Sequence, residues 1–286
     1  MRLLSRRVSG RLSAKRRSPM AGLVVLLMGL LLTGGAYAVL SPATAQDDLV
    51  SDQALVDQGR KLFLVGCSSC HGMNAEGIST KKGGQYGPSL VGVGAAAVDF
   101  QVATGRMPMA QPGVQAQAKE PLYTPDETRA LAAYIASLGP GPAIPEESKY
   151  SLEDVDNEAV VRGGQFFLTN CTACHNFAGS GGALPQGKYA PALKGVTPKH
   201  IYEAMLTGPQ QMPVFSDEVL QPDEKRDIIA YLKSIEEAPE YGGFSLGGYG
   251  PVSEGLFAWL VGIGGLVGFA IWIASSTTRS KRGTKA

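Results

Sequence analysis

The sequence predicts an all-α protein in which two tandem helical domains lie outside a membrane, flanked by an N-terminal and a C-terminal transmembrane helix. Three observations predict this fold: an internal duplication, an amphipathic helical pattern that closes each copy, and an apolar run near each end of the chain. The predicted segments are a basic cytoplasmic tail over 1–19, a transmembrane helix or uncleaved signal anchor over 20–40, a first domain over 51–140, an acidic, proline-rich linker over 141–157, a second domain over 158–240, a transmembrane helix over 255–275 and a basic cytoplasmic tail over 276–286.

The charge distribution limits the class of protein. The 286 residues carry a formal net charge of +1. Seven basic residues and no acidic residue lie in residues 1–19, and four basic residues and no acidic residue lie in 276–286. The segment between these tails is therefore acidic, which excludes a basic body that would bind nucleic acid.

Two apolar runs have the length of a membrane-crossing helix. Met20–Leu40 has 21 residues and Leu256–Ala274 has 19, and neither contains a charged side chain. A helix needs about 20 residues to cross a bilayer. Because Lys and Arg mark the cytoplasmic flank of a span, both tails are predicted to be cytoplasmic and residues 41–254 extracytoplasmic. The protein is thus predicted to be a multi-pass protein of the cell membrane.

Each apolar run has an alternative interpretation. Small residues at Ala36–Ala38 and Ala43–Ala45 also fit a cleaved signal peptide, although a retained anchor is favoured. The C-terminal run also fits a buried core helix. Trp259 and Trp272 lie near its two ends, where interfacial aromatic residues occur, and favour a membrane span.

The four cysteines fall into two copies of one motif. Each copy reads C-x-x-C-H, the attachment signature of c-type haem, in which two thiols bond the porphyrin and the adjacent His binds the iron. The two intervening residues set the thiols at the separation of two porphyrin substituents. The copies are Cys67-Ser68-Ser69-Cys70-His71 and Cys171-Thr172-Ala173-Cys174-His175.

Three other uses of paired cysteines fit less well. A thioredoxin-type redox pair belongs in a βαβ pattern, which this sequence lacks. Structural disulfides in an exported protein give no reason for a His after each pair. Zinc needs four ligands, but the two pairs lie about a hundred residues apart, each within its own matching context. The sequence therefore predicts two covalently bound haems c.

The matching context is an internal duplication. Upstream of the motifs, Gly59–Leu64 aligns with Gly163–Leu168, and downstream Tyr86–Val93 aligns with Tyr189–Val196. A Met-Pro element follows at Met107 and again at Met212, 36 and 37 positions after the respective histidines. Each copy then closes with a helix whose apolar residues recur at i, i+3, i+4 and i+7. These residues are Leu131, Tyr134, Ile135 and Leu138 in the first copy and Ile228, Tyr231, Leu232 and Ile235 in the second.

These parts, in this order, resemble tandem class I cytochrome c domains over roughly residues 51–138 and 158–236. With the N-terminal basic anchor, a Gly-Gly-Tyr-Gly-Pro stretch at 247–251 and a C-terminal span, the whole chain resembles the dihaem cytochrome c subunits of actinobacterial cytochrome bcc complexes. The resemblance implies that Cys67 and Cys70, and Cys171 and Cys174, bind the haems covalently. It implies that the axial iron ligands are His71 with Met107 and His175 with Met212, and that the Pro88 and Pro191 carbonyls accept hydrogen bonds from the proximal imidazoles.

Several nearby residues compete for the ligand roles. Met109 lies two positions from Met107 and is its rival as distal ligand of the first haem. Met205 is expected to pack in the core, and Met73 is expected in a loop on the proximal side. His200, the one remaining histidine, is expected to face solvent at the start of a helix rather than to bind the second iron.

Two features depart from a simple tandem repeat. The first copy has an insertion, Ala110–Lys119, between its Met-Pro element and its last helix. It either packs on a partner subunit or is a tolerated surface excursion. The linker is proline-rich and then acidic, and it is either a solvated spacer or a docking segment for a basic patch.

The resemblance implies the electron-transfer subunit of a respiratory quinol:cytochrome c reductase, a translocase complex. Electrons would pass from a Rieske iron–sulfur protein, which assembles with cytochrome b, through the two haems to a haem-copper cytochrome c oxidase. With both irons six-coordinate, the subunit would perform no substrate chemistry and need no catalytic residue. The alternatives are the dihaem subunit of a cbb-type oxidase, whose anchor is N-terminal, and a dihaem peroxidase, which needs one open or switchable iron.

Overall fold

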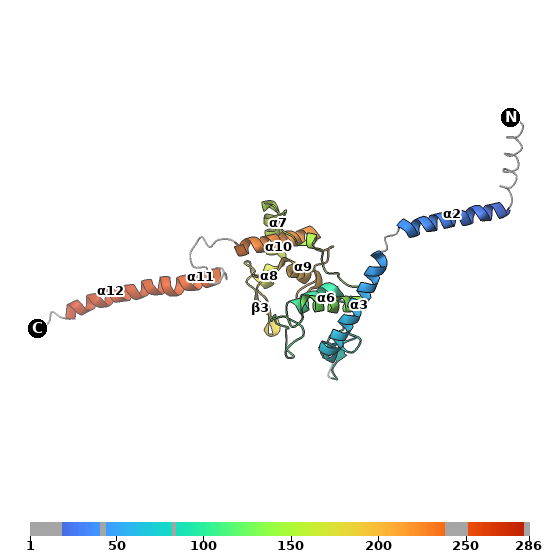
Figure 1. Cartoon of the computed structure of the whole chain (residues 1–286). Coiled ribbons are helices and arrows are strands. Elements are labelled where there is room, and N and C mark those ends of the chain that lie inside the picture. The colour runs from blue at the N-terminus through green and yellow to red at the C-terminus, as the bar shows by residue number, and fades with distance from the viewer. Residues whose placement is uncertain (1–18, 41–43, 82–83, 238–250, 283–286) are drawn as a thin grey trace, which may run out of the picture. The chain divides into compact units, whose positions relative to one another are not determined.

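The computed structural model describes residues 19–40, 44–81, 84–237 and 251–282 (Figure 1). The chain divides into two compact units, Met1–Ala54 and Leu55–Ala286. Three predicted features fall wholly or largely outside the described residues: the tail over 1–18, the end of the C-terminal tail over 283–286, and the Gly-Gly-Tyr-Gly-Pro stretch.

Long apolar helices lie toward both ends of the chain. Near the N-terminus, α2 (Pro19–Leu40) contains the apolar stretch Gly22–Gly35, which is shorter than a full span. Near the C-terminus, α11 (Pro251–Phe257), the π-helical segment η4 (Ala258–Ile263) and α12 (Gly264–Arg282) follow one another. Within them, Ser253–Ser275 is the one helical stretch of the described residues that is long and apolar enough to cross a membrane.

The first domain runs from the C-terminal part of α3 (Thr44–Gly66) to α6 (Pro125–Ser137). Thr124 and Glu127 form a capping box at the start of α6, in which the Thr124 hydroxyl accepts from Glu127 N–H while the Glu127 carboxylate accepts from Thr124 N–H. Gly59 lets α3 approach α6, since an added Cβ would overlap the Ala130 carbonyl. Between them lie α4 (Ser68–His71), β1 (Ile78–Ser79), β2 (Gln85–Gly87) and α5 (Gly94–Ala103).

The second domain repeats this arrangement. Helix α7 (Asn157–Asn170) packs against α10 (Pro222–Glu237), and Gly163 permits the contact because a Cβ there would overlap the Asp227 carbonyl. The Glu224 carboxylate accepts from Gln221 N–H at 2.7 Å and so caps the start of α10. Between them lie α8 (Thr172–His175), β3 (Gly182–Leu184), the 3₁₀ turn η2 (Pro185–Gly187), β4 (Lys188–Ala190) and α9 (Pro198–Thr207).

Each domain also contains a short antiparallel hairpin, formed by β1 with β2 and by β3 with β4. The protein is therefore mostly helical, and the hairpins are an addition to the all-α prediction. Strands of two or three residues are too short to show an alternating pattern in a sequence. Each hairpin ends immediately before a predicted haem-site proline, Pro88 or Pro191, and so fixes the position of that proline's carbonyl.

Two separate hydrophobic clusters lie within the unit Leu55–Ala286. In each, an aromatic ring of the helix before the C-x-x-C-H motif packs against a tyrosine of the closing helix: the ring centroids of Phe63 and Tyr134 are 5.3 Å apart, and those of Phe167 and Tyr231 are 5.5 Å apart. The buried members of the first cluster are Phe63, Ala75, Val102, Leu131, Tyr134 and Ile135. Those of the second are Phe167, Ile201, Tyr202, Met205, Leu220, Ile228, Ile229 and Leu232.

Candidate haem-binding sites

Each C-x-x-C-H motif folds into one helical turn. The amide of His71 donates to the carbonyl of Cys67 at 3.0 Å, and the amide of His175 donates to that of Cys171 at 2.9 Å. Residues three and four apart lie on one face of a helix. The turn therefore presents two thiols and an imidazole to the same side, as covalent attachment of one porphyrin with an axial His requires.

The proximal imidazoles are held by the prolines that the resemblance indicates. His71 donates its Nδ1–H to the carbonyl of Pro88 at 2.8 Å, and His175 donates its Nδ1–H to the carbonyl of Pro191 at 3.0 Å. A carbonyl only accepts hydrogen bonds, so Nδ1 carries the proton and Nε2 keeps its lone pair. Each ring is thus oriented with Nε2 ready to bind a metal ion.

Burial favours the neutral form of His175 and of the first cysteine in each motif. Burial lowers the pKa of His175, although the hydrogen bond to Pro191 opposes this effect. Burial, and then the neighbouring cysteine, raises the pKa of Cys67 and of Cys171 to about 11. None of the four cysteines forms a disulfide. Reactive redox cysteines have a depressed pKa, so this environment does not fit a thioredoxin-type pair.

A cavity of about 190 Å³ adjoins the second motif. Cys171, Cys174 and His175 line it together with Met212, the predicted distal ligand, and the rest of its wall is largely apolar. Met205 is buried and belongs to the second hydrophobic cluster, as expected. Two thiols, a neutral imidazole and a thioether around an apolar space are the donor set of a covalently bound haem with His and Met ligands, so the residues fit that group.

In the first domain, the two candidate methionines lie in different surroundings. Met107 packs against the first hydrophobic cluster, as Cys67 does. Met109 lines a separate cavity of about 350 Å³ formed mostly by the insertion. Met73 is exposed, as expected of a loop residue. Met107 is therefore better placed than Met109 to face the first motif.

The insertion of the first domain contacts the second domain. Tyr189 N–H, in β4, donates to the side-chain oxygen of Gln115 at 2.9 Å, and the Gln115 side-chain NH₂ donates to the Tyr189 carbonyl at 2.8 Å. Ala116 is buried, and Ala116 and Ala118 line the cavity beside the second motif. The structure adds a contact that neither interpretation named, because Gln115 and Ala116 pack on the other half of the same chain while most of the segment is exposed.

Other first-domain residues also reach this cavity. Phe100 and Arg106 line it, and the Arg106 guanidinium lies 4.7 Å from the centre of the Phe100 ring. The ring of His200 meets Phe100 edge-on, with centroids 6.3 Å apart. The expectation that His200 faces solvent is wrong: its side chain is 19% exposed because α5 covers the start of α9. Contacts between segments a hundred residues apart leave no local signal in the sequence.

The linker contacts both domains rather than serving only as a solvated spacer. The Pro142 carbonyl accepts from the amide of Ala96 in α5 at 3.1 Å. The 3₁₀ turn η1 (Glu147–Lys149) then leads to Tyr150 and Leu152, which pack against the second hydrophobic cluster. Its acidic side chains are exposed.

Comparisons with known proteins agree with the two-site arrangement. The family model described as "Cytochrome c" matches residues 56–139, and the model described as "Cytochrome C oxidase, cbb3-type, subunit III" matches residues 158–232. The "Cytochrome bc1 complex cytochrome c subunit" of Corynebacterium efficiens is 48% identical over 276 residues, covering 91% of this chain and 90% of that protein. Proteins with the same name from Mycobacterium bovis and Mycobacterium leprae are 43% and 42% identical, covering 93% and 88% of this chain and 95% and 86% of theirs.

Proposed function

Because the chain belongs to the family of cytochrome c subunits of the cytochrome bc1 complex, we propose that it passes electrons from a Rieske iron–sulfur protein through two haems c to a haem-copper oxidase. The match extends over about nine-tenths of the chain, so it includes both C-x-x-C-H motifs. Cytochrome b and the Rieske protein are the proposed partners within the complex. The oxidase is the proposed electron acceptor.

The observation that carries this proposal is the equivalent geometry of the two sites. In both, a helical turn presents two thiols, and a proline carbonyl fixes the imidazole with Nε2 free. The proposed covalent attachment points are Cys67, Cys70, Cys171 and Cys174. The proposed iron ligands are His71 with Met107 and His175 with Met212, with Pro88 and Pro191 orienting the imidazoles.

A haem c with His and Met ligands supplies an iron centre that exchanges one electron without opening a position for substrate. The residues of the chain therefore bind and orient the haems and exclude water from them. None is needed as an acid, base or nucleophile. The Pro88 and Pro191 carbonyls hold the imidazoles, and Ala116 and Phe100 cover part of the second cavity. In this proposal the chain is an electron-transfer subunit of quinol–cytochrome-c reductase with no substrate chemistry of its own.

The proposed topology is multi-pass, with spans at 20–40 and 255–275, haem domains at 51–140 and 158–240 outside the cytoplasm, and both termini inside. The apolar, exposed surface of Ser253–Ser275 supports the second span. The basic residues at both ends of the sequence support the orientation.

The alternatives receive less support. The cbb3-type likeness is limited to residues 158–232, whereas the relatives named for the bc1 complex match most of the chain. A peroxidase needs an iron open to peroxide, and Met212 lines the second cavity together with His175.

The test is purification of the tagged chain from its native membranes. We expect two haems c per chain by pyridine haemochrome assay and co-purification of cytochrome b, a Rieske protein and oxidase subunits. The double variant Cys171→Ala/Cys174→Ala should retain one haem, whereas the exposed Ser69→Ala within the first motif should retain both. A chain isolated without these subunits, with peroxide-reactive high-spin iron, would refute the proposal.

A further inference from the structure

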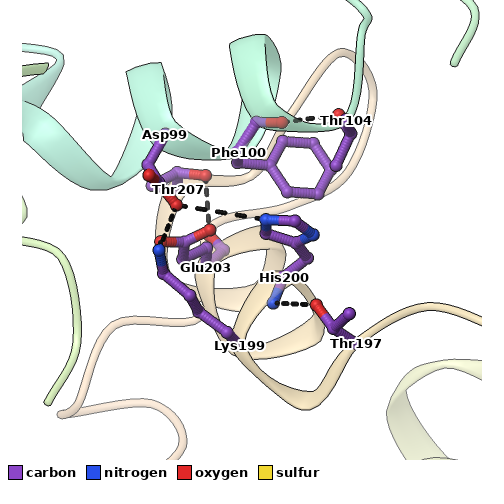
Figure 2. Close-up of polar contacts among 8 residues, drawn as sticks. All are labelled: Asp99, Phe100, Thr104, Thr197, Lys199, His200, Glu203 and Thr207. Atoms are coloured by element: carbon purple, nitrogen blue, oxygen red, sulfur yellow. Dashed lines mark hydrogen bonds and ion pairs between the residues drawn. The ribbon is translucent and has the colours of Figure 1, made fainter. Parts of the chain in front are cut away.

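A buried polar cluster joins the two domains beside the second cavity (Figure 2). Asp99 comes from α5 of the first domain, and Lys199, His200 and Glu203 come from one face of α9. The Lys199 ammonium lies 2.6 Å from Asp99 Oδ2 and 3.9 Å from Glu203 Oε1, and His200 Nε2 lies 4.0 Å from Asp99 Oδ2. The haem-site residues proposed above do not include any of these four.

The cluster contains two buried carboxyl groups but one ammonium group. The Asp99 side chain is 8% exposed and pairs closely with Lys199. The Glu203 side chain is 0% exposed, and neither of its oxygens has a hydrogen-bond partner in the described protein. Two neighbouring buried carboxyl groups cannot both ionise cheaply, so one of them holds a proton. Glu203 is that group, because Asp99 already has the closer cation.

The electrostatics of Glu203 agree with this geometry. Burial is the largest cause raising its pKa, the neighbouring Asp99 raises it further, and Lys199 opposes them, which leaves a pKa of about 9. Asp99, His200 and Glu203 also present three possible metal-ligand atoms within 4.8 Å of one another. The Lys199 ammonium already provides the positive charge among them, so a proton on Glu203 completes the charge balance without a metal ion.

The helix that carries Glu203 also forms a wall of the second cavity. Ile201, Ala204 and Met205 line that cavity, and so does His200, whose ring reaches both the cavity and Asp99. The buried acid is therefore on the same helix as residues that line the proposed haem site, next to Ala204 in the chain. In a low-dielectric interior, a charge that appears in this cavity acts on Glu203 with little screening.

We propose that Glu203 is a proton-binding site coupled to the second haem, which releases a proton when that haem is oxidised and takes one up when it is reduced. This inference rests on the proposed function, which places a haem at His175. On oxidation, one electron leaves the iron for the next carrier, and Glu203 changes from carboxylic acid to carboxylate. The proton leaves toward solvent on the side of Lys199, whose side chain is 31% exposed.

The sign follows from the charges. Oxidation adds one positive charge to the cavity, which favours the carboxylate form of Glu203 and lowers its pKa. By linkage, the reduction potential of the second haem then falls as pH rises through the range below about 9. The charged side chains Lys225 and Asp227 of α10 have partners outside the cluster. Lys225 pairs with Asp217, and Asp227 pairs with Arg162. The other titratable or charged groups around the cluster are Asp99 on α5, Arg106 after it, Lys199 and His200 on α9, and Tyr150 after η1.

The test is redox potentiometry of both haems in the purified complex across a pH series. In the wild type, we expect the second haem's potential to fall with rising pH, with a slope below the limit of about 59 mV per pH unit for one proton per electron. Glu203→Gln replaces the acid with a group that cannot release a proton and should flatten this slope. Glu218→Gln, a change of an exposed acid in the same domain, should leave it unchanged.

Two further measurements keep the outcome decisive. Asp99→Asn removes the negative charge beside Glu203, so that Lys199 pairs with Glu203 alone. The pH range over which the potential changes should then move to lower pH. This variant keeps the inference testable if Glu203→Gln fails to fold. Redox-difference infrared spectra should contain a carboxylic acid band that Glu203→Gln removes. A flat wild-type profile, or an equal slope in Glu203→Gln, would overturn the inference. Fewer than two haems per chain would instead overturn the proposed function.

Discussion

Replacement of Gln115 by Ala should detach the insertion from the second domain. The wild-type side chain makes two hydrogen bonds to the Tyr189 backbone, at 2.8 and 2.9 Å. At about 0.5 to 1.5 kcal/mol for each hydrogen bond, their loss removes about 1 to 3 kcal/mol from this contact. Because 1.4 kcal/mol is a factor of ten, the open state should become about 5- to 150-fold more populated.

Hydrogen–deuterium exchange of the haem-loaded chain measures this opening directly, because the Tyr189 amide is one of the two donors. The exchange rate of that amide and of residues 110–119 should rise by the same factor. Opening also admits water to the second cavity, which Ala116 and Ala118 line, so the potential of the second haem should shift while that of the first does not. Gln117→Ala truncates an exposed side chain of the same segment and serves as the control. Equal exchange in Gln115→Ala and the wild type would refute the reasoning.

Three further predictions test other parts of the structure. Met107→Leu should abolish one of two low-spin His/Met absorption signals, whereas Met109→Leu should leave both, and the opposite result would reassign the ligand. Gly163→Ala should destabilise the second domain by about 1 to 3 kcal/mol in denaturant unfolding, because its Cβ would overlap a carbonyl of α10; Gly268→Ala, where the added Cβ meets open space, should not. The pKa of Glu203 is raised from 4.5 to about 9, so the folded chain holds a proton that the unfolded chain loses in this pH range. The free energy of unfolding should therefore decline as pH rises from about 4.5 to 9. Glu203→Gln should lessen that decline, and an undiminished decline would contradict the assignment.

The sequence predicts best those features that depend on neighbouring residues. The helix predicted from the spacing of Leu131, Tyr134 and Ile135 forms, because the pattern repeats within a few helical turns. The duplicated glycines Gly59 and Gly163 occupy equivalent helix crossings, because both copies must pack the same two helices. The hydrogen bonds from the proximal imidazoles to Pro88 and Pro191 span 17 and 16 residues, and the resemblance to a known family, rather than local pattern, is what implied them.

The features that the sequence does not predict are contacts between the two copies. His200 lies in the first turn of a helix beside a lysine, a pattern typical of an exposed position, yet Phe100 of the other domain packs against it. Gln115 lies in a segment with no counterpart in the second copy, so the alignment of the copies gives no expectation for it. Such non-local packing depends on how two folded surfaces meet, and neither surface is encoded in one stretch of sequence.

The contacts between the copies explain why a tandem arrangement suits electron transfer. A flexible tether would only raise the effective concentration of one haem near the other, and their separation would still fluctuate. Here two separate contacts join the domains: Gln115 with Tyr189, and Asp99 with Lys199. Both lie beside the second cavity, so the residues that fix the spacing between the sites also determine how much water and charge the second site meets. Distance and reduction potential are therefore set by the same interface, and a change in that interface alters both.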